Sequence, residues 1–194
     1  MATIGSYILV RNEIQFIRAH LSAWLPYLDS MTFFDGDSSD GTLEVISEFE
    51  KQHEHGHKIS LYLGRNPKDL EDDYTRMFNE CLQSVRSDYA FFLHPDMLPE
   101  NPEAVANIKA NDDAIAFSVG MRSFAGEPDG PLFEIVGSGR CDKWKSIERL
   151  HNPSLGLEYF GHYGAWNEDR YFKSITGNAH VHFGPMFQHY PYPV

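Results

Sequence analysis

The sequence predicts an α/β domain with a mainly parallel central sheet flanked by helices. Short apolar runs alternate with segments of helical hydrophobic spacing over residues 1–120, which is the pattern of successive β–α units. Three of the apolar runs end in polar clusters, and open α/β sheets bind ligands along the edge where such clusters meet. The 194 residues, of which 42% are hydrophobic, suffice for one domain with a sizeable core.

The first predicted strand covers residues 7–10, a continuous apolar run that ends at the polar residues 11–13. A helix is expected next, because apolar side chains recur at helical spacing over residues 16–28. A second strand at residues 31–34 runs into the acidic segment FFDGDSSDGT, and a second helix begins after Asp40. The polar segment KQHEHGHK that follows is expected to be a solvated loop.

A third strand is expected at residues 59–64, and a long amphipathic helix at residues 67–86. Cys81 lies on the apolar stripe of this helix, where it is most simply a small buried hydrophobe. The fourth strand, residues 89–93, is wholly apolar and ends at a His-Pro-Asp triplet. A short helix and a fifth strand, residues 114–121, complete this part of the chain.

Beyond about residue 125 the pattern changes to sequence rich in Gly, Pro, His and aromatic residues, without strong periodicity. We expect loops and short elements laid over the sheet edge, where an acceptor site or a lid would form. The chain is therefore interpreted as one domain, residues 1–194. Residues 1–120 would bind a nucleotide, and residues 121–194 would form the acceptor side.

Composition excludes several classes of partner and location. The net charge of −12 argues against nucleic acid, whose phosphates require a basic surface. Two cysteines without a CxxC pair argue against a disulfide framework and for a reducing compartment. The N-terminus does not resemble a signal peptide, and no apolar run approaches the roughly 18 residues that cross a bilayer. These observations predict a cytoplasmic protein.

Several familiar chemistries find no support in the motifs. The segment SSDGTL resembles the DxDGT signature of haloacid-dehalogenase-like phosphotransferases, but Ser38 holds the position of the nucleophilic aspartate. The chain has no GxxxxGK[ST] phosphate loop, no GxGxxG after the first strand and no GxSxG nucleophile turn. The acidic segment is therefore better interpreted as a recognition loop than as a catalytic centre.

Four segments in order resemble family 2 glycosyltransferases of the GT-A (Rossmann-like) fold. YILVRNE is similar to their opening strand, and FFDGDSSDGT to their vDxGSTDGT segment, with Asp37 where Gly is usual. RMFNECL is similar to their RNxAL piece, and DYAFFLHPDML to the strand that carries their DxD motif. Two later segments, SIERL and YFKSI with HVHFG, resemble ERf and KsI…H segments of the same superfamily.

The resemblance implies a nucleotide-diphosphate sugar as donor, most simply a UDP-sugar, and an acceptor hydroxyl of unknown identity. Asp35 would accept a hydrogen bond from the base or the ribose, and Lys173 would neutralise the diphosphate. The implied nucleotide-binding residues are Val10, Arg11, Glu13, Asp35, Asp37, Arg76 and Lys173. Two alternatives stay open: Glu13 as an acid stabilised at a helix start, and Asp40 as a helix N-cap.

The resemblance also implies a divalent metal, Mn²⁺ or Mg²⁺. Asp96 keeps the DxD position that usually meets the ion, while His94 replaces the first aspartate. Oxygen ligands suit both ions and Mn²⁺ also tolerates imidazole; His94 would bind metal, contact ribose or only pack. His182 would complete the metal shell from the C-terminal part, with His180 as the alternative.

Transfer with inversion requires a general base near the acceptor hydroxyl, normally a carboxylate. Glu148 in IERL and Asp169 in WNEDRY are the candidates. The sequence thus predicts a metal-dependent, inverting hexosyltransferase. Two other classes remain: a GT-A-like module that binds nucleotide-sugar without turnover, and a nucleotidyltransferase, although the latter usually carries a glycine-rich N-terminal loop.

Overall fold

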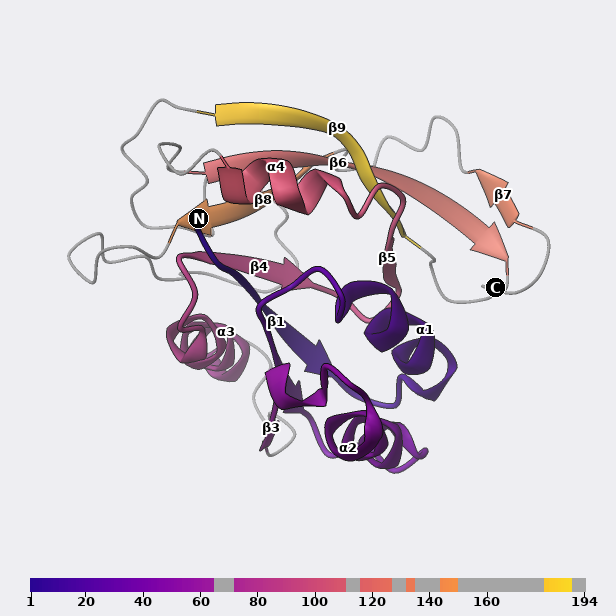
Figure 1. The fold of residues 1–194 in the computed structure, drawn as a ribbon. Helices are drawn as coiled ribbons and strands as arrows, with labels where there is room; N and C mark the ends of the chain where they lie inside the picture. Colours follow the sequence, from indigo (N-terminus) through magenta and orange to yellow (C-terminus); the bar gives the residue numbers. More distant parts are fainter. Residues whose placement is uncertain (65–71, 111–115, 127–131, 135–143, 150–179, 190–194) are drawn as a thin grey trace.

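The computed structural model describes residues 1–64, 72–110, 116–126, 132–134, 144–149 and 180–189 (Figure 1). Its strands are β1 (Ile4–Val10), β2 (Ser30–Asp35), β3 (Ile59–Leu63), β4 (Tyr89–Leu93), β5 (Met97–Pro99), β6 (Ala116–Gly126), β7 (Leu132–Glu134), β8 (Trp144–Arg149) and β9 (His180–His189). Its helices are α1 (Ile14–Trp24), α2 (Thr42–Gln52), the 3₁₀ turn η1 (Gly56–Lys58), α3 (Asp72–Ser84) and α4 (Ala104–Ala110).

The strands form one sheet in the order β3-β2-β1-β4-β8-β6-β9-β5, with β7 paired to β6. Strands β3, β2, β1 and β4 are parallel neighbours. Beyond β4, strand β8 pairs antiparallel with both β4 and β6, while β6 and β9 are parallel. The predicted α/β architecture with a mainly parallel sheet flanked by helices is confirmed.

The C-terminal part differs from the expectation of loops laid over the sheet edge. In the described residues it supplies β8, β9 and the short β7, so it widens the sheet itself. Ten-residue β9 contains a glycine and a proline, and its pairing with β6 is irregular on either side of Gly120. Such interruptions break the alternation by which a strand is recognised in sequence, which explains why this strand was not predicted.

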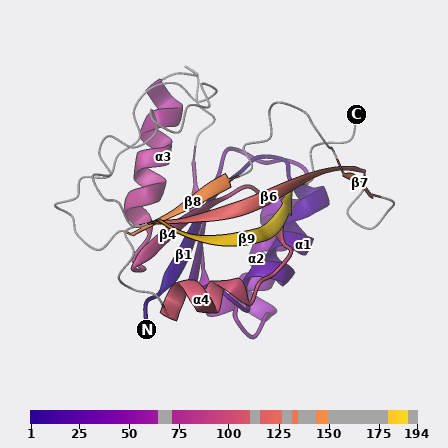
Figure 2. The same ribbon diagram turned by 90° about the horizontal axis from the view of Figure 1, so that it is seen from above.

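The helices cover both faces of the sheet, as Figure 2 shows from above. Helices α1, α2 and α4 pack on one face, where alternate β1 residues such as Ile4 and Ile8 join the larger core cluster. Helix α3 packs on the opposite face, where Cys81, Leu82 and Val85 contact Tyr7 of β1. Burial of both faces explains why β1, β2 and β4 are continuous apolar runs. Burial also raises the pKa of the Cys81 thiol, which is an inert core residue as predicted.

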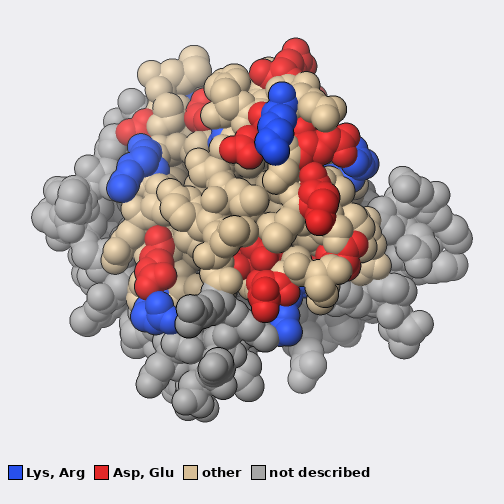
Figure 3. Space-filling view, turned by 90° about the horizontal axis from the view of Figure 1, so that it is seen from below, with Lys and Arg blue, Asp and Glu red and all other residues tan. Residues whose placement is uncertain are grey.

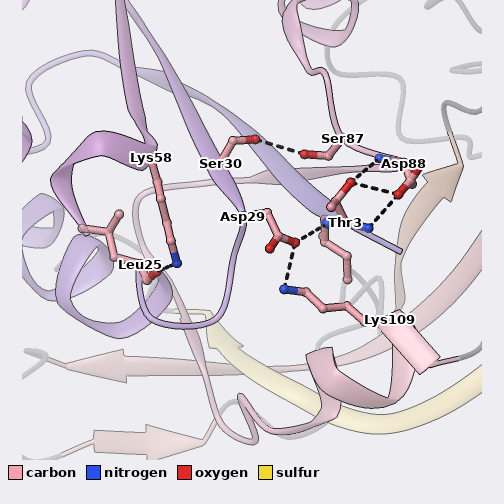
Figure 4. Close-up of polar contacts among 9 residues, drawn as sticks. Thr3, Leu25, Asp29, Ser30, Lys58, Ser87, Asp88 and Lys109 are labelled. Atoms are coloured by element: carbon pink, nitrogen blue, oxygen red, sulfur yellow. Dashed lines mark hydrogen bonds and ion pairs between the residues drawn. The ribbon is translucent and has the colours of Figure 1, made fainter. Parts of the chain in front are cut away.

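Polar contacts fasten the amino edge of the sheet (Figure 4). Thr3 donates hydrogen bonds from its N–H and its hydroxyl to Asp88 Oδ2, at 2.8 and 2.9 Å. Asp29 Oδ2 accepts from the N–H of Ile4 at 2.7 Å and pairs with Lys109 Nζ at 2.8 Å. These side chains connect β1 to the segments before β2 and β4 and to α4. The amino edge is thus occupied by structural contacts, which leaves the carboxyl edge for a ligand.

The surface agrees with the acidic composition. Acidic side chains outnumber basic ones on the face seen from below, and the described residues there form no continuous basic patch (Figure 3). In the described part of the chain, no helix combines the length and apolar character that crossing a membrane requires.

Candidate functional site

The polar clusters predicted from the sequence meet at the carboxyl edge of the sheet. Val10, the last residue of β1, pairs with Asp35, the last residue of β2. On the other side of β1, Leu93 at the end of β4 pairs with Ile8. The chain order reverses between β1 and β4, because β2 and β3 extend the sheet in one direction and β4 in the other. Ligands of open α/β sheets bind at such a reversal, outside the carboxyl ends of the strands.

The loops after β1 and β2 are joined by hydrogen bonds. The N–H of Asn12 donates to Ser38 Oγ at 3.0 Å, and the N–H of Ser39 donates to Asn12 Oδ1 at 2.8 Å. The N–H of Gly36 also donates to the carbonyl of Val10 at 2.8 Å. The two loops therefore form one connected surface beside the point where the chain order of the sheet reverses, the topological switch point between β1 and β4.

Asp35 is buried in this surface, with 3% of its area exposed. Its Oδ2 accepts hydrogen bonds from the N–H groups of Asp37 and Ser38, both at 2.9 Å. Its Oδ1 is also buried and has no hydrogen-bond partner among the described residues. A buried acceptor without a partner is costly, and a donor on a bound ligand would remove that cost.

Two non-glycine residues in these loops have left-handed backbone conformations, Asn12 with φ 57° and Asp37 with φ 72°. Asn and Asp tolerate this region better than other side chains, but glycine adopts it most readily. The left-handed conformation at position 37 thus explains why glycine is usual there in the family segment that FFDGDSSDGT resembles. The exposed Asp37 side chain is not needed to hold the loop, whose bond to Asp35 uses the Asp37 N–H.

Asp40 binds the starts of two helices. Its Oδ1 accepts from the N–H and hydroxyl of Thr42, at 3.0 and 2.6 Å, and its Oδ2 accepts from the N–H of Ile14 at 3.0 Å. Partial burial acts to raise the pKa of Asp40, but these hydrogen bonds outweigh it and lower the pKa below the ordinary value. Asp40 is not the N-cap of α2, because that position is held by Gly41. It instead accepts from the first N–H of α2 and from the first N–H of α1.

The remaining nucleotide-site candidates have different surroundings. Val10 and Glu13 are buried, and the N–H of Glu13 donates to Thr42 Oγ1 at 2.8 Å. Glu13 occupies the N-cap position of α1 without a side-chain capping bond. Arg11 is exposed. Arg76 lies on α3, where it pairs with Glu80 at 3.0 Å.

The segment after β4 is a tight turn. The N–H of Met97 donates to the carbonyl of His94 at 3.0 Å, with Pro95 and Asp96 between them. Asp96 is 7% exposed, and the ring of His94 meets Phe92 edge to face at 4.6 Å. The carboxylate of Asp96 suits a hard divalent cation, and Mn²⁺ also tolerates the imidazole of His94. Among the described side chains, however, no three His, Cys, Asp or Glu groups come together as a metal site.

Strand register locates the candidates of the C-terminal part. Glu148 pairs with Ala90, four positions before His94, which is about 13 Å along the strand. His182 pairs with Ser118 of β6, well inside the sheet. Asp169 and Lys173 lie outside the described residues.

The register brings a different histidine beside the turn. Strand β5 pairs antiparallel with the end of β9, with Met97 opposite His189. Seven positions separate His189 from His182, about 23 Å of extended chain. His189 is therefore the β9 histidine whose backbone lies next to Asp96. Sequence reasoning missed it because only the long-range pairing of β5 with β9 shows the proximity.

Comparison with known proteins identifies the architecture. No protein-family model matches the chain, and no curated protein is significantly similar to it in sequence. Two solved structures align over nearly the whole chain, each with a TM-score of 0.67. S. aureus TarS 1-349 in complex with UDP-GlcNAc is 10% identical and covers 97% of this chain. GalNAc-T7 with UDP, GalNAc and Mn²⁺ is 13% identical and covers 98%.

The chain has the GT-A fold. A mannosyltransferase from Pyrobaculum calidifontis, in complex with GDP-Man and Mn²⁺, is also similar, with a TM-score of 0.52 and 18% identity over 62% of this chain. The chain corresponds to 58% of the TarS structure, 44% of GalNAc-T7 and 36% of the mannosyltransferase. At these identities the similarity establishes the GT-A fold and not the activity.

Proposed function

We propose that the protein is a metal-dependent glycosyltransferase that moves a sugar from a nucleotide-diphosphate sugar, most simply a UDP-sugar, to an acceptor hydroxyl. One observation carries the proposal: two interlocked loops and the buried Asp96 turn meet at the switch point of a GT-A sheet. The structural neighbours include complexes with UDP, UDP-GlcNAc and GDP-Man, which supports a donor of this class.

The loops after β1 and β2 would hold the nucleoside. Asp35 Oδ1 would accept a hydrogen bond from the base or from a ribose hydroxyl, since it is buried with no partner among the described residues. Val10, Arg11 and Glu13 would line the base pocket from β1 and the loop after it, and Asp37 would border it from the next loop. Further along the chain, Arg76 and Lys173 would offer positive charge to the diphosphate.

Asp96 would hold the divalent cation, with His94 beside it and a histidine of β9 completing the set. Among the β9 histidines, the register favours His189 over His182. A bound Mn²⁺ or Mg²⁺ would supply neutralisation of the diphosphate charge. Two of the neighbouring structures contain Mn²⁺, which supports a metal of this kind.

In the inverting reaction a carboxylate would accept the proton of the acceptor hydroxyl. The hydroxyl oxygen bonds to the anomeric carbon, the bond from that carbon to the diphosphate oxygen breaks, and the electron pair leaves with the nucleoside diphosphate. Glu148 and Asp169 are the candidates for this base. The register weighs against Glu148, because its backbone lies level with Ala90, away from the carboxyl edge.

The test measures hydrolysis of UDP-sugars and GDP-mannose with and without Mn²⁺, together with thermal shifts for the free nucleotides, since ligands of the native state raise the melting temperature. We expect Mn²⁺-stimulated hydrolysis that Asp96→Ala abolishes. His189→Ala should weaken the Mn²⁺ dependence more than the matched His182→Ala. The absence of any shift with every nucleotide tested would contradict the proposal.

The second candidate is a nucleotide-sugar-binding module without turnover. It is favoured by one observation, that His94 replaces the first aspartate of the resembling DxD segment, which leaves one carboxylate in the turn. Binding of UDP without hydrolysis or transfer from any donor would select this candidate over the enzyme.

A further inference from the structure

The carbonyl of Met97, directly after Asp96, accepts two side-chain hydrogen bonds from α1. Trp24 Nε1 donates to it at 2.8 Å, and His20 Nδ1 lies 3.1 Å from the same oxygen. Both side chains are fully buried. Because a carbonyl can only accept, the ring of His20 must carry its proton on Nδ1.

The two donors fix the end of the turn in more than one direction. His20 and Trp24 are four residues apart and so lie on the same face of α1. Trp24 is held edge to face against Phe91 of β4, at 5.7 Å, and His20 is held in the same way against Phe33 of β2, at 6.4 Å. Each donor is therefore anchored to a different strand of the parallel sheet.

Asp96 lies between two fixed points. On its N-terminal side, the ring of Pro95 restricts the backbone. On its C-terminal side, the N–H of Met97 closes the turn onto His94, and the carbonyl of Met97 is held by α1. The carboxylate of Asp96 thus projects from a backbone whose position depends on α1.

One donor would satisfy the need of a buried carbonyl for a partner. The N–H of Trp24 would be sufficient as that donor, and an apolar side chain at position 20 could also contact Phe33 and Trp24, which His20 touches with its ring. A second, polar donor instead leaves Nε2 of His20 buried without a hydrogen-bond partner among the described residues. That cost is understandable if the position of the Met97 peptide itself matters.

We propose that His20 and Trp24 are positioning residues, whose paired hydrogen bonds to the Met97 carbonyl hold Asp96 in the geometry that a divalent cation requires. The inference rests on the proposed function, in which Asp96 is the metal ligand. Groups that hydrogen-bond to a metal ligand commonly change the metal affinity 10- to 100-fold. Here the hydrogen bonds are made to the backbone directly after the ligand, at the Met97 carbonyl.

The test compares Mn²⁺ affinity among variants, measured by the loss of the free Mn²⁺ electron paramagnetic resonance signal on titration. Trp24→Phe keeps an aromatic ring and removes the N–H, and His20→Leu removes the second donor. We expect each to weaken Mn²⁺ binding about 10-fold, while UDP affinity in the presence of chelator stays unchanged. His20→Asn, which places an amide donor near the position of Nδ1, should recover most of the affinity.

Ile17→Val is the matched control, because Ile17 is fully buried on the same helix and makes no side-chain hydrogen bond. It should leave Mn²⁺ affinity unchanged even if it lowers the melting temperature. Wild-type affinity in Trp24→Phe and His20→Leu, with Asp96→Ala unable to bind, would refute the positioning role and leave the metal site in place. A wild-type protein that binds no Mn²⁺ would overturn the metal-dependent function together with this inference.

Discussion

Folding stability should fall between pH 7 and pH 5 because His20 is buried. Full burial lowers its pKa from 6.5 to about 4, against the opposing effect of hydrogen bonding to the backbone of Met97 and Pro95. Between these two values the unfolded chain binds a proton that the folded chain does not. The stabilisation from neutral His20 is therefore complete above the unfolded pKa and is lost as the pH falls toward the folded one.

The size of the effect follows from the two pKa values. By linkage, the free energy of unfolding falls by about 2 kcal/mol between pH 7 and pH 5, and the total loss reaches a limit of about 3 kcal/mol at lower pH. Urea unfolding at a series of pH values measures it, and His20→Asn is the reference, since asparagine keeps a donor but does not titrate. We expect the difference between the two proteins to shift by about 2 kcal/mol over this range. Parallel pH profiles would show that His20 titrates normally and would refute the buried, neutral state.

Three further predictions concern stability, measured by urea unfolding. Asp40→Ala should cost about 1–3 kcal/mol because two helix starts lose their acceptor; its exposed neighbour variant Glu44→Ala should cost little. The lowered pKa of Asp40 makes its contribution complete above the unfolded pKa, and we expect it to be lost as the pH falls through the folded one. Asp37→Gly should stabilise by up to about 1 kcal/mol, since it relieves a positive φ, and Asp37→Val should destabilise. Gly5→Ala should cost about 1–3 kcal/mol, because its Cβ would collide with Ser30 Oγ and lie 2.7 Å from Ser87 Oγ. Unchanged stability in Asp40→Ala or Gly5→Ala would contradict these contacts.

The sequence was most informative where local pattern determines structure. The apolar runs of β1, β2 and β4 are recognisable because both faces of these strands are buried. The apolar stripes of α1 and α3 are recognisable because each helix packs one face against the sheet. The convergence of the strands' polar ends could also be predicted, since parallel strands place their carboxyl ends on one edge. Asp37 stood out as a departure from glycine, and its positive φ supplies the reason.

The sequence was least informative where structure depends on long-range pairing. The proximity of His189 to Asp96 arises from the β5–β9 ladder, and the contact between His20 and Met97 spans 77 residues. Neither leaves a trace in hydrophobic periodicity, because the residues involved belong to different elements. The widened sheet was missed for the same reason, since β8 joins β4 and β6 across long stretches of chain.

The central place of β1 has a consequence for how the protein is made. β1 is synthesised before β4, yet β4 is one of its two neighbours, and Thr3 is bound to Asp88, 85 residues later. Lys109 completes the contacts of this edge. β1 therefore stays half-paired until the 83 residues from its end to the end of β4 have been translated (93 − 10), and such non-local closure is slow. We expect the nascent chain to remain aggregation-prone and open to chaperones over this interval.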